Sequence, residues 1–199
     1  MTLAGDFRLA ARLCNAQLPA LGATLALISV LALALPARPQ GKGSLKAVHA
    51  RLAEHVRHQL VMLPYYSVFD NLEFRIEGID TIVLSGQVMR PSLKSDAEST
   101  VRRLEGVGKV VNSIEVLPLS PNDDRIRRAV YHTISAKPAL DRYFLRAVPP
   151  IHIIVKDGNV TLVGVVASQV DKDLAGLAAR EVPGVFSLTN NLRVENPSR

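Results

Sequence analysis

An internal duplication is the sequence feature that most limits how this chain can fold. Residues 81–117 and 159–195 align without gaps at an offset of 78, with ten identical pairs in 37 positions. Two copies of one pattern predict the same small folding unit twice, because both copies have the same apolar positions to bury. Residues 45–118 are the first repeat and residues 122–195 the second.

Each repeat predicts a β-hairpin. In the second repeat, Asp157-Gly158 separates two runs of alternating apolar residues, 151–155 and 160–164. Asp-Gly between such runs favours a two-residue turn, because that turn needs positive φ at both positions. The first repeat has the looser sequence Glu77-Gly78-Ile79-Asp80 at the same place.

Helices are predicted before and after each hairpin from apolar residues spaced by three or four. We expect helices at 45–62, 92–104, 123–136 and 171–181, and final strands at 110–117 and 186–195. Gly106 and Gly184 are expected to end the second helix of each repeat as C′ residues. Gly86 and Gly164, inside strands, are expected to allow close packing. The predicted class is α+β: two tandem α-β-β-α-β modules, each a three-stranded sheet covered by two helices, preceded by a hydrophobic helix.

The N-terminal region, residues 1–40, predicts export. Leu18–Ala37 is a twenty-residue, almost wholly apolar run, and Arg8 and Arg12 precede it. A basic start followed by an apolar core is typical of a secretory signal peptide. The run is also long enough to span a bilayer as an uncleaved anchor. Both alternatives stay open, and both place residues 38–199 outside the cytoplasm, in the periplasm or cell envelope.

Net charge and residue types limit the partners, cofactors and activities that this chain can have. The chain carries 24 Lys and Arg against 18 Asp and Glu, a net charge of +6, which favours polyanionic partners. The only cysteine is Cys14, so an internal disulfide is excluded. No pattern of catalytic or phosphate-binding residues stands out. His55 and His58 lie one helical turn apart with Glu54 as the one carboxylate candidate beside them, and a solvated polar helix face explains them better than a metal site. We therefore expect a protein with no enzymatic activity, no cofactor, no metal site and no nucleic-acid partner.

The repeated motif resembles the BON domain (bacterial OsmY and nodulation). In the second repeat the matching residues are Val155, Asp157, Gly158, Val160, Leu162, Gly164, Val166, Gly184, Val185, Asn190, Leu192 and Val194. In the first repeat they are Leu84, Gly86, Val88, Gly106, Val107, Asn112 and Val116, whereas the turn departs from the pattern. The resemblance implies a periplasmic or envelope protein, with phospholipid binding, osmotic stress or outer-membrane maintenance as associated roles. It implies no catalytic residues.

One region of the second repeat is a candidate membrane-binding surface. Residues 123–146 hold six basic and three acidic residues, and bulky apolar groups alternate with cations after Pro138. At an anionic membrane such rings lie at the headgroup level while arginines meet phosphates. The candidate lipid-binding residues are Arg125, Arg128, Arg142, Phe144 and Arg146. The alternative is that Tyr143, Phe144 and Leu145 pack a helix onto the sheet.

The leading hypothesis is a tandem-repeat envelope protein that binds anionic phospholipid membranes and supports envelope integrity or stress tolerance. The alternative is a structural module that oligomerises, by itself or with other envelope proteins, while anchored in the inner membrane through residues 18–37.

Overall fold

The computed structural model describes residues 41–195, which lie within one compact unit that runs from Gln40 to Arg199. The hydrophobic run 18–37, predicted to be a signal peptide or an anchor, lies outside the described residues. Within residues 41–195, none of the helices has the length and apolar character needed to cross a bilayer.

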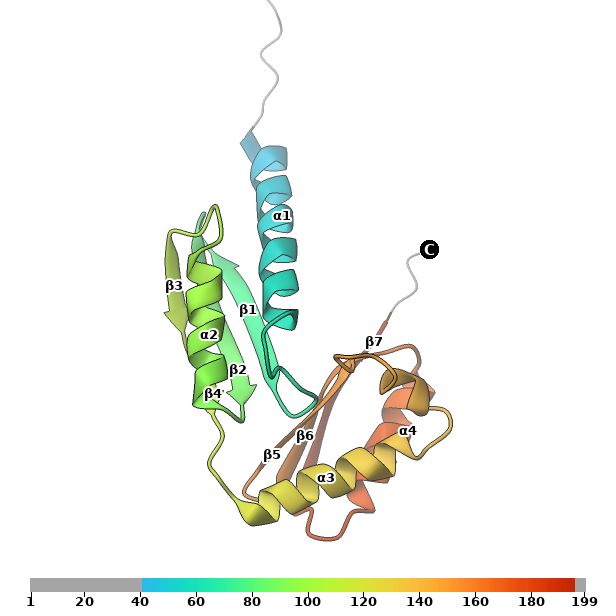
Figure 1. Cartoon of the computed structure of the whole chain (residues 1–199). Helices are drawn as coiled ribbons and strands as arrows, with labels where there is room; N and C mark the ends of the chain where they lie inside the picture. Colours follow the sequence, from blue (N-terminus) through green and yellow to red (C-terminus); the bar gives the residue numbers. More distant parts are fainter. Residues whose placement is uncertain (1–40, 196–199) are drawn as a thin grey trace, which may run out of the picture. The chain divides into compact units, whose positions relative to one another are not determined.

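The first repeat has the predicted order of helix, hairpin, helix and final strand (Figure 1). Its elements are α1 (Gly41–Val61), β1 (Asn71–Glu77), β2 (Thr81–Val88), α2 (Pro91–Arg102), β3 (Lys109–Asn112) and β4 (Glu115–Val116). β1 pairs with β2 in antiparallel fashion, and β2 pairs with β3 and β4 in parallel. The start of α1 differs from the prediction, because the helix begins at Gly41 and not at Leu45.

The second repeat has the same order (Figure 1). Its elements are α3 (Pro121–Ser135), the 3-10 turn η1 (Asp141–Tyr143), β5 (Ile151–Lys156), β6 (Asn159–Val166), α4 (Gln169–Arg180) and β7 (Ser187–Val194). β5 and β6 are antiparallel, and β6 and β7 are parallel. α3 begins two residues before the predicted start at Asp123. The Ser120 hydroxyl caps the helix by accepting from the Asp123 amide at 3.2 Å, and proline is well tolerated at the first helical position.

The predicted α+β class and the two tandem modules are confirmed, with one correction to the strands. The final strand of the first repeat is not continuous, because its pairing with β2 is interrupted at Ser113 and Ile114. Among residues 41–195, its sheet therefore has four strands, whereas the sheet of the second repeat has the predicted three. The Ser113 amide still donates to the Leu84 carbonyl at 2.8 Å, so the two short strands follow one path beside β2.

The glycines inside strands are close-packing positions, as predicted. Gly164 has a φ of +136°, and a Cβ there would lie 1.9 Å from the carbonyl oxygen of Pro150. Gly86 has a φ of +107°, and its Cβ would lie 2.1 Å from the carbonyl oxygen of Asn71. Any side chain would collide with the neighbouring strand, so only glycine keeps the hairpin paired at this point.

The two glycines after the second helices are not the C′ residues that we predicted. Both have positive φ, +87° at Gly106 and +94° at Gly184. However, the helices end earlier, with Arg103 and Glu181 as C-cap residues in the right-handed region. Each glycine instead turns the chain from the loop toward the final strand, three residues beyond the cap.

Each repeat has its own hydrophobic core between its helices and one face of its sheet. In the first repeat, Ile82 and Leu84 alternate along β2 and meet Val56 of α1 and Ala97 of α2. The core of the second repeat is built in the same way around β5 and β6, with one addition. Val68, from the segment between α1 and β1 of the first repeat, is 9% exposed and packs in the core of the second repeat.

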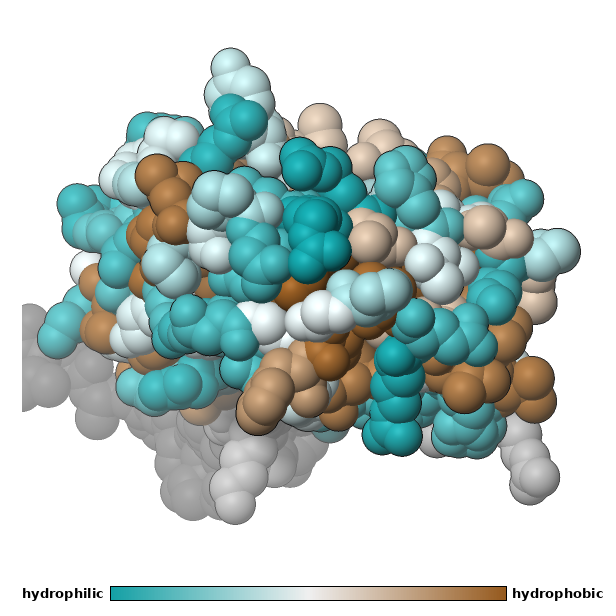
Figure 2. All heavy atoms as spheres, turned by 90° about the horizontal axis from the view of Figure 1, so that it is seen from below, coloured by the Kyte–Doolittle hydropathy of each residue, from teal (hydrophilic) through white to brown (hydrophobic). Residues whose placement is uncertain are grey.

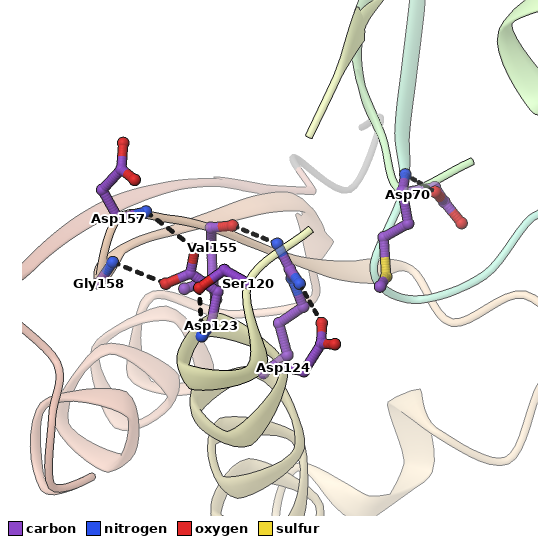
Figure 3. A network of polar contacts seen from close by, with 9 residues as sticks. Asp70, Ser120, Asp123, Asp124, Val155, Asp157 and Gly158 are labelled. Carbon is purple, nitrogen blue, oxygen red and sulfur yellow. Dashed lines mark hydrogen bonds and ion pairs between the residues drawn. The ribbon is translucent and has the colours of Figure 1, made fainter. Parts of the chain in front are cut away.

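One buried carboxylate ties the first turn of α3 to the β5–β6 turn (Figure 3). Asp123, 1% exposed, accepts from the Asp157 amide at 3.0 Å and from the Gly158 amide at 2.9 Å. Asp157 and Gly158 have φ of +52° and +75°, which confirms the tight turn predicted from the Asp-Gly pair. The position 78 residues before Asp123 is Leu45, so the first repeat lacks this link.

Candidate functional site

A groove of about 450 Å³ opens beside α3 and joins residues of both repeats. α3 contributes Arg128, Tyr131 and His132. The segment between α1 and β1 contributes residues 66–69, and the chain after η1 contributes Phe144, Arg146, Ala147 and Pro149. We call this feature the aromatic groove.

Three rings form the apolar part of the aromatic groove. Tyr131 is central: its ring centroid lies 5.3 Å from that of Phe144 and 6.1 Å from that of Phe69, both in edge-to-face orientation. Such pairs are favourable beyond the area that they bury, so the three rings hold α3, the first-repeat segment and the chain after η1 together. Phe144 and Tyr131 also pack against the core of the second repeat.

Two arginines give the aromatic groove its charge. The side chains of Arg128 and Arg146 are exposed and line it. Within residues 41–195, neither takes part in an ion pair. Leu145, between Phe144 and Arg146, is 80% exposed. On the face of the molecule seen from below Figure 1, where α3 and α4 lie, hydrophobic side chains lie among hydrophilic ones (Figure 2).

Arg142 is positioned differently from Arg128 and Arg146. Its guanidinium lies 2.7 Å from the Asp171 carboxylate, so much of its charge is compensated within the second repeat. Burial alone would raise the pKa of Asp171, but hydrogen bonds from Tyr143 and Ser168 and the charge of Arg142 lower it below its usual value. Arg142 and Arg146 line a neighbouring hollow of about 520 Å³.

Tyr143 has a structural role in the same network. Its hydroxyl donates to Asp171 at 2.8 Å and accepts from the Ala167 amide at 2.8 Å. The equivalent amide of the first repeat, that of Met89, donates instead to the Asp70 carboxylate at 2.7 Å. The same backbone donor is therefore satisfied by a different side chain in each repeat, which is how the two copies have diverged around one fold.

The structure brings together three of the five candidate lipid-binding residues. Arg128, Phe144 and Arg146 line one groove, whereas Arg142 is paired with Asp171. Arg125 lies near the N-terminal end of α3, where it donates to the Asn122 side chain at 2.9 Å. The alternative was that Tyr143, Phe144 and Leu145 pack in the core. Tyr143 and Phe144 do pack there, whereas Leu145 is exposed.

Sequence reasoning missed Phe69, Tyr131 and a buried arginine. Arg127 is 2% exposed, and its guanidinium bonds the Asp124 carboxylate and the Val155 carbonyl, each at 2.5 Å. Helical spacing was the available signal, because Arg127 is four residues after Asp123 and three before Val130, both buried. An arginine on that face is held inside the module and is not available to a ligand.

A second, larger hollow of about 1050 Å³ is lined by residues of β1 and β2, by His152 and by others. It differs from the aromatic groove in how its arginines are paired. Two of its three arginines are paired, Arg57 with Glu54 and Arg75 with Glu77. The aromatic groove is therefore the better candidate for an anionic ligand. Within residues 41–195, no three side chains of the metal-binding types come together.

Fold and groove together define a protein made of two small α+β modules that share one basic, aromatic-lined groove. The family model of the BON domain matches residues 49–118 and again residues 122–196. The chain belongs to the BON domain family. This family is non-catalytic in general, and its domains indicate an envelope-associated protein.

Comparison with curated proteins finds no match. Among solved structures, two of CdsD, a structural protein of the type III secretion system of Chlamydia trachomatis, are similar. Its C-terminal domain is 12% identical over 73% of this chain and 98% of that chain, with a TM-score of 0.26. The second is 12% identical over 71% and 91%, with a TM-score of 0.27. Likeness at this level carries no functional argument.

Proposed function

We propose that this chain is a periplasmic, non-enzymatic envelope protein that attaches to anionic phospholipid membranes through the aromatic groove and its rim. The observation that carries the proposal is a pair of exposed arginines, Arg128 and Arg146, that form no ion pair within residues 41–195 and lie beside three clustered rings. A role in envelope integrity or stress tolerance accords with the family to which the chain belongs.

The chemistry of the groove suits a phosphate headgroup at a membrane surface. Each basic residue near an anionic leaflet contributes about 1 kcal/mol. Leu145, 80% exposed beside Arg146, adds about 1.5–3 kcal/mol if it becomes buried among acyl chains. Tyr131 and Phe144 offer ring edges at headgroup depth. The sum is a few kcal/mol, so the attachment is reversible and weakens with salt.

Attachment at a surface accords with the predicted export of residues 38–199. As a cleaved signal peptide, the run 18–37 leaves the groove as the membrane contact of the mature chain. As an uncleaved anchor, it holds the repeats near one membrane, and the groove then gives contact with headgroups. N-terminal sequencing of the protein isolated from cells separates the two: a start near Leu35 or Arg38 means cleavage.

Flotation with vesicles tests the proposal. Both cores lie within the compact unit 40–199, so the experiment uses residues 38–199, without the hydrophobic run that would bind vesicles by itself. We expect flotation with vesicles rich in phosphatidylglycerol and little with phosphatidylcholine alone. Raising the salt from about 0.05 M to about 0.5 M should weaken it strongly, because the Debye length falls to about a third and the arginine charges are screened from the anionic surface.

Matched arginine pairs make the test specific. Arg128→Ala with Arg146→Ala should weaken vesicle binding about 20- to 30-fold, the equivalent of about 2 kcal/mol. Arg103→Ala with Arg180→Ala removes the same charge from exposed positions outside the groove and should have a much smaller effect. Equal effects of the two pairs would mean that net charge, and not the groove, attracts the membrane. Absence of flotation, or stable multimers of the same fragment that form without lipid, would favour the structural-module alternative.

A further inference from the structure

The segment between α1 and β1 belongs to the first repeat by sequence but is bound to the second. The Val68 carbonyl accepts from the Ile153 amide of β5 at 2.8 Å, on the side of β5 that does not pair with β6. The Val68 side chain completes the core of the second repeat, and Phe69 packs against the same core. The two repeats therefore meet through backbone pairing as well as through side chains.

The aromatic groove depends on this contact. Tyr66, Ser67, Val68 and Phe69 of the first repeat form one part of its lining, and residues of the second repeat form the rest. Loss of the contact between Val68 and Ile153 would remove Phe69 from Tyr131 and open the groove on that side. The groove is complete only while the two repeats are in contact.

Asp70 connects this segment firmly to the sheet of the first repeat (Figure 3). Its Oδ2 accepts from the Ser67 amide at 3.1 Å and from the Ser67 hydroxyl at 2.7 Å, and its Oδ1 accepts from the Met89 amide. Tyr66, next to Ser67, faces His152 of β5, with ring centroids 5.5 Å apart. Asp70 therefore joins the first-repeat lining of the groove to the sheet of the first repeat.

We propose that the two repeats bind one phosphate-headed amphiphile jointly, so that occupation of the groove and closure of the contact between the repeats are thermodynamically linked. This inference rests on the proposed function of the groove. A ligand that binds only the closed form stabilises that form, and in turn anything that opens the contact weakens binding by the same factor. With free lipid at about 100 times its Kd, opening of the contact becomes about 100-fold rarer.

Hydrogen exchange of the Ile153 amide measures the contact directly, because that amide donates across it. Residues 38–199 are compared with phosphatidylglycerol vesicles, with phosphatidylcholine vesicles and with inorganic phosphate. The Phe186 amide, bonded to the Gly158 carbonyl within the second repeat, serves as the control. We expect phosphatidylglycerol to slow exchange at Ile153 much more than at Phe186. Equal slowing at both amides would indicate general stabilisation and overturn the linkage. If inorganic phosphate slows exchange at Ile153 as much as phosphatidylglycerol vesicles do, the ligand is not an amphiphile.

A variant outside the groove tests the linkage in the other direction. His152 does not line the groove, and His152→Glu places a carboxylate against Tyr66 and near Asp70. We expect faster exchange at Ile153 and at least tenfold weaker flotation, although Arg128 and Arg146 are intact. His152→Phe keeps a ring against Tyr66 and should float like the parent.

The outcomes separate the two claims. If the parent fragment does not float, the proposed function is wrong and the linkage falls with it. If the parent floats and its Ile153 amide is not selectively protected, only the linkage is wrong. The same conclusion follows if His152→Glu speeds exchange at Ile153 and floats unchanged. Should that variant unfold, which fast exchange at Phe186 would reveal, the measurement on the parent still decides.

Discussion

Replacement of Asp123 by alanine should destabilise the second repeat by about 2–4 kcal/mol. The carboxylate is 1% exposed and accepts from two turn amides, those of Asp157 and Gly158. Without it, the buried Gly158 amide loses its partner, at about 1–3 kcal/mol. The Asp157 amide belongs to an exposed residue and regains water, so its loss is smaller, about 0.5–1.5 kcal/mol. Removal of a negative charge from the first turn of α3 adds a few tenths more.

Urea unfolding of residues 38–199, followed by circular dichroism, measures this loss as a shift in midpoint at unchanged slope. Asp123→Asn keeps the shape and one acceptor oxygen, so about half of the loss is expected. Asp173→Ala on α4, where the side chain is exposed, is the control and should stay within about 0.5 kcal/mol of the parent. A loss below about 1 kcal/mol for Asp123→Ala would show that this carboxylate does not hold the hairpin turn to α3.

Three further predictions concern stability. Burial lowers the pKa of His152, so the folded state binds fewer protons than the unfolded state. Stability should therefore be full above about pH 6.5 and fall as the pH drops below it, an effect that His152→Phe removes in thermal melts at about pH 7.5 and 5.5. Gly164→Ala should cost at least about 3 kcal/mol in urea unfolding, because its Cβ would lie 1.9 Å from a carbonyl oxygen; a near-neutral effect would contradict the close approach. Asn190→Ala should cost about 1–3 kcal/mol, because this side chain donates to the Lys172 carbonyl at 2.8 Å and accepts from the Leu192 amide at 3.3 Å; a loss within about 0.5 kcal/mol would mean that the bridge contributes nothing.

The predicted helix starts illustrate where local patterns are weak. Apolar spacing placed α3 from Asp123, but the helix begins at Pro121, because a capping serine and a proline extend it without adding any apolar residue. α1 likewise begins at Gly41 and not at Leu45, because residues 41–44 add no bulky apolar residue to the helical pattern. The strand break at Ser113 was missed as well, since residues 110–117 carry no proline or glycine to mark it.

The candidate site was predicted in part. Composition and aromatic interleaving were enough to single out Arg128, Phe144 and Arg146, which do line one groove. The same reasoning also selected Arg142, because a count of charges does not reveal that Asp171 lies 2.7 Å from its guanidinium. The lipid-binding role itself stays a prediction for the vesicle experiment.

The sequence by itself determined the duplication, the order of elements in each repeat, the tight Asp-Gly turn and the glycines that allow close approach. These features are local: periodicity of 2 or 3.6 and the φ demands of a turn act over a few residues. Only the tertiary structure decided that Val68 and Phe69 of the first repeat complete the core and groove of the second. Val68 and Ile153 are 85 positions apart in the sequence, and no local pattern encodes a contact that arises when two finished modules bury apolar surface against each other.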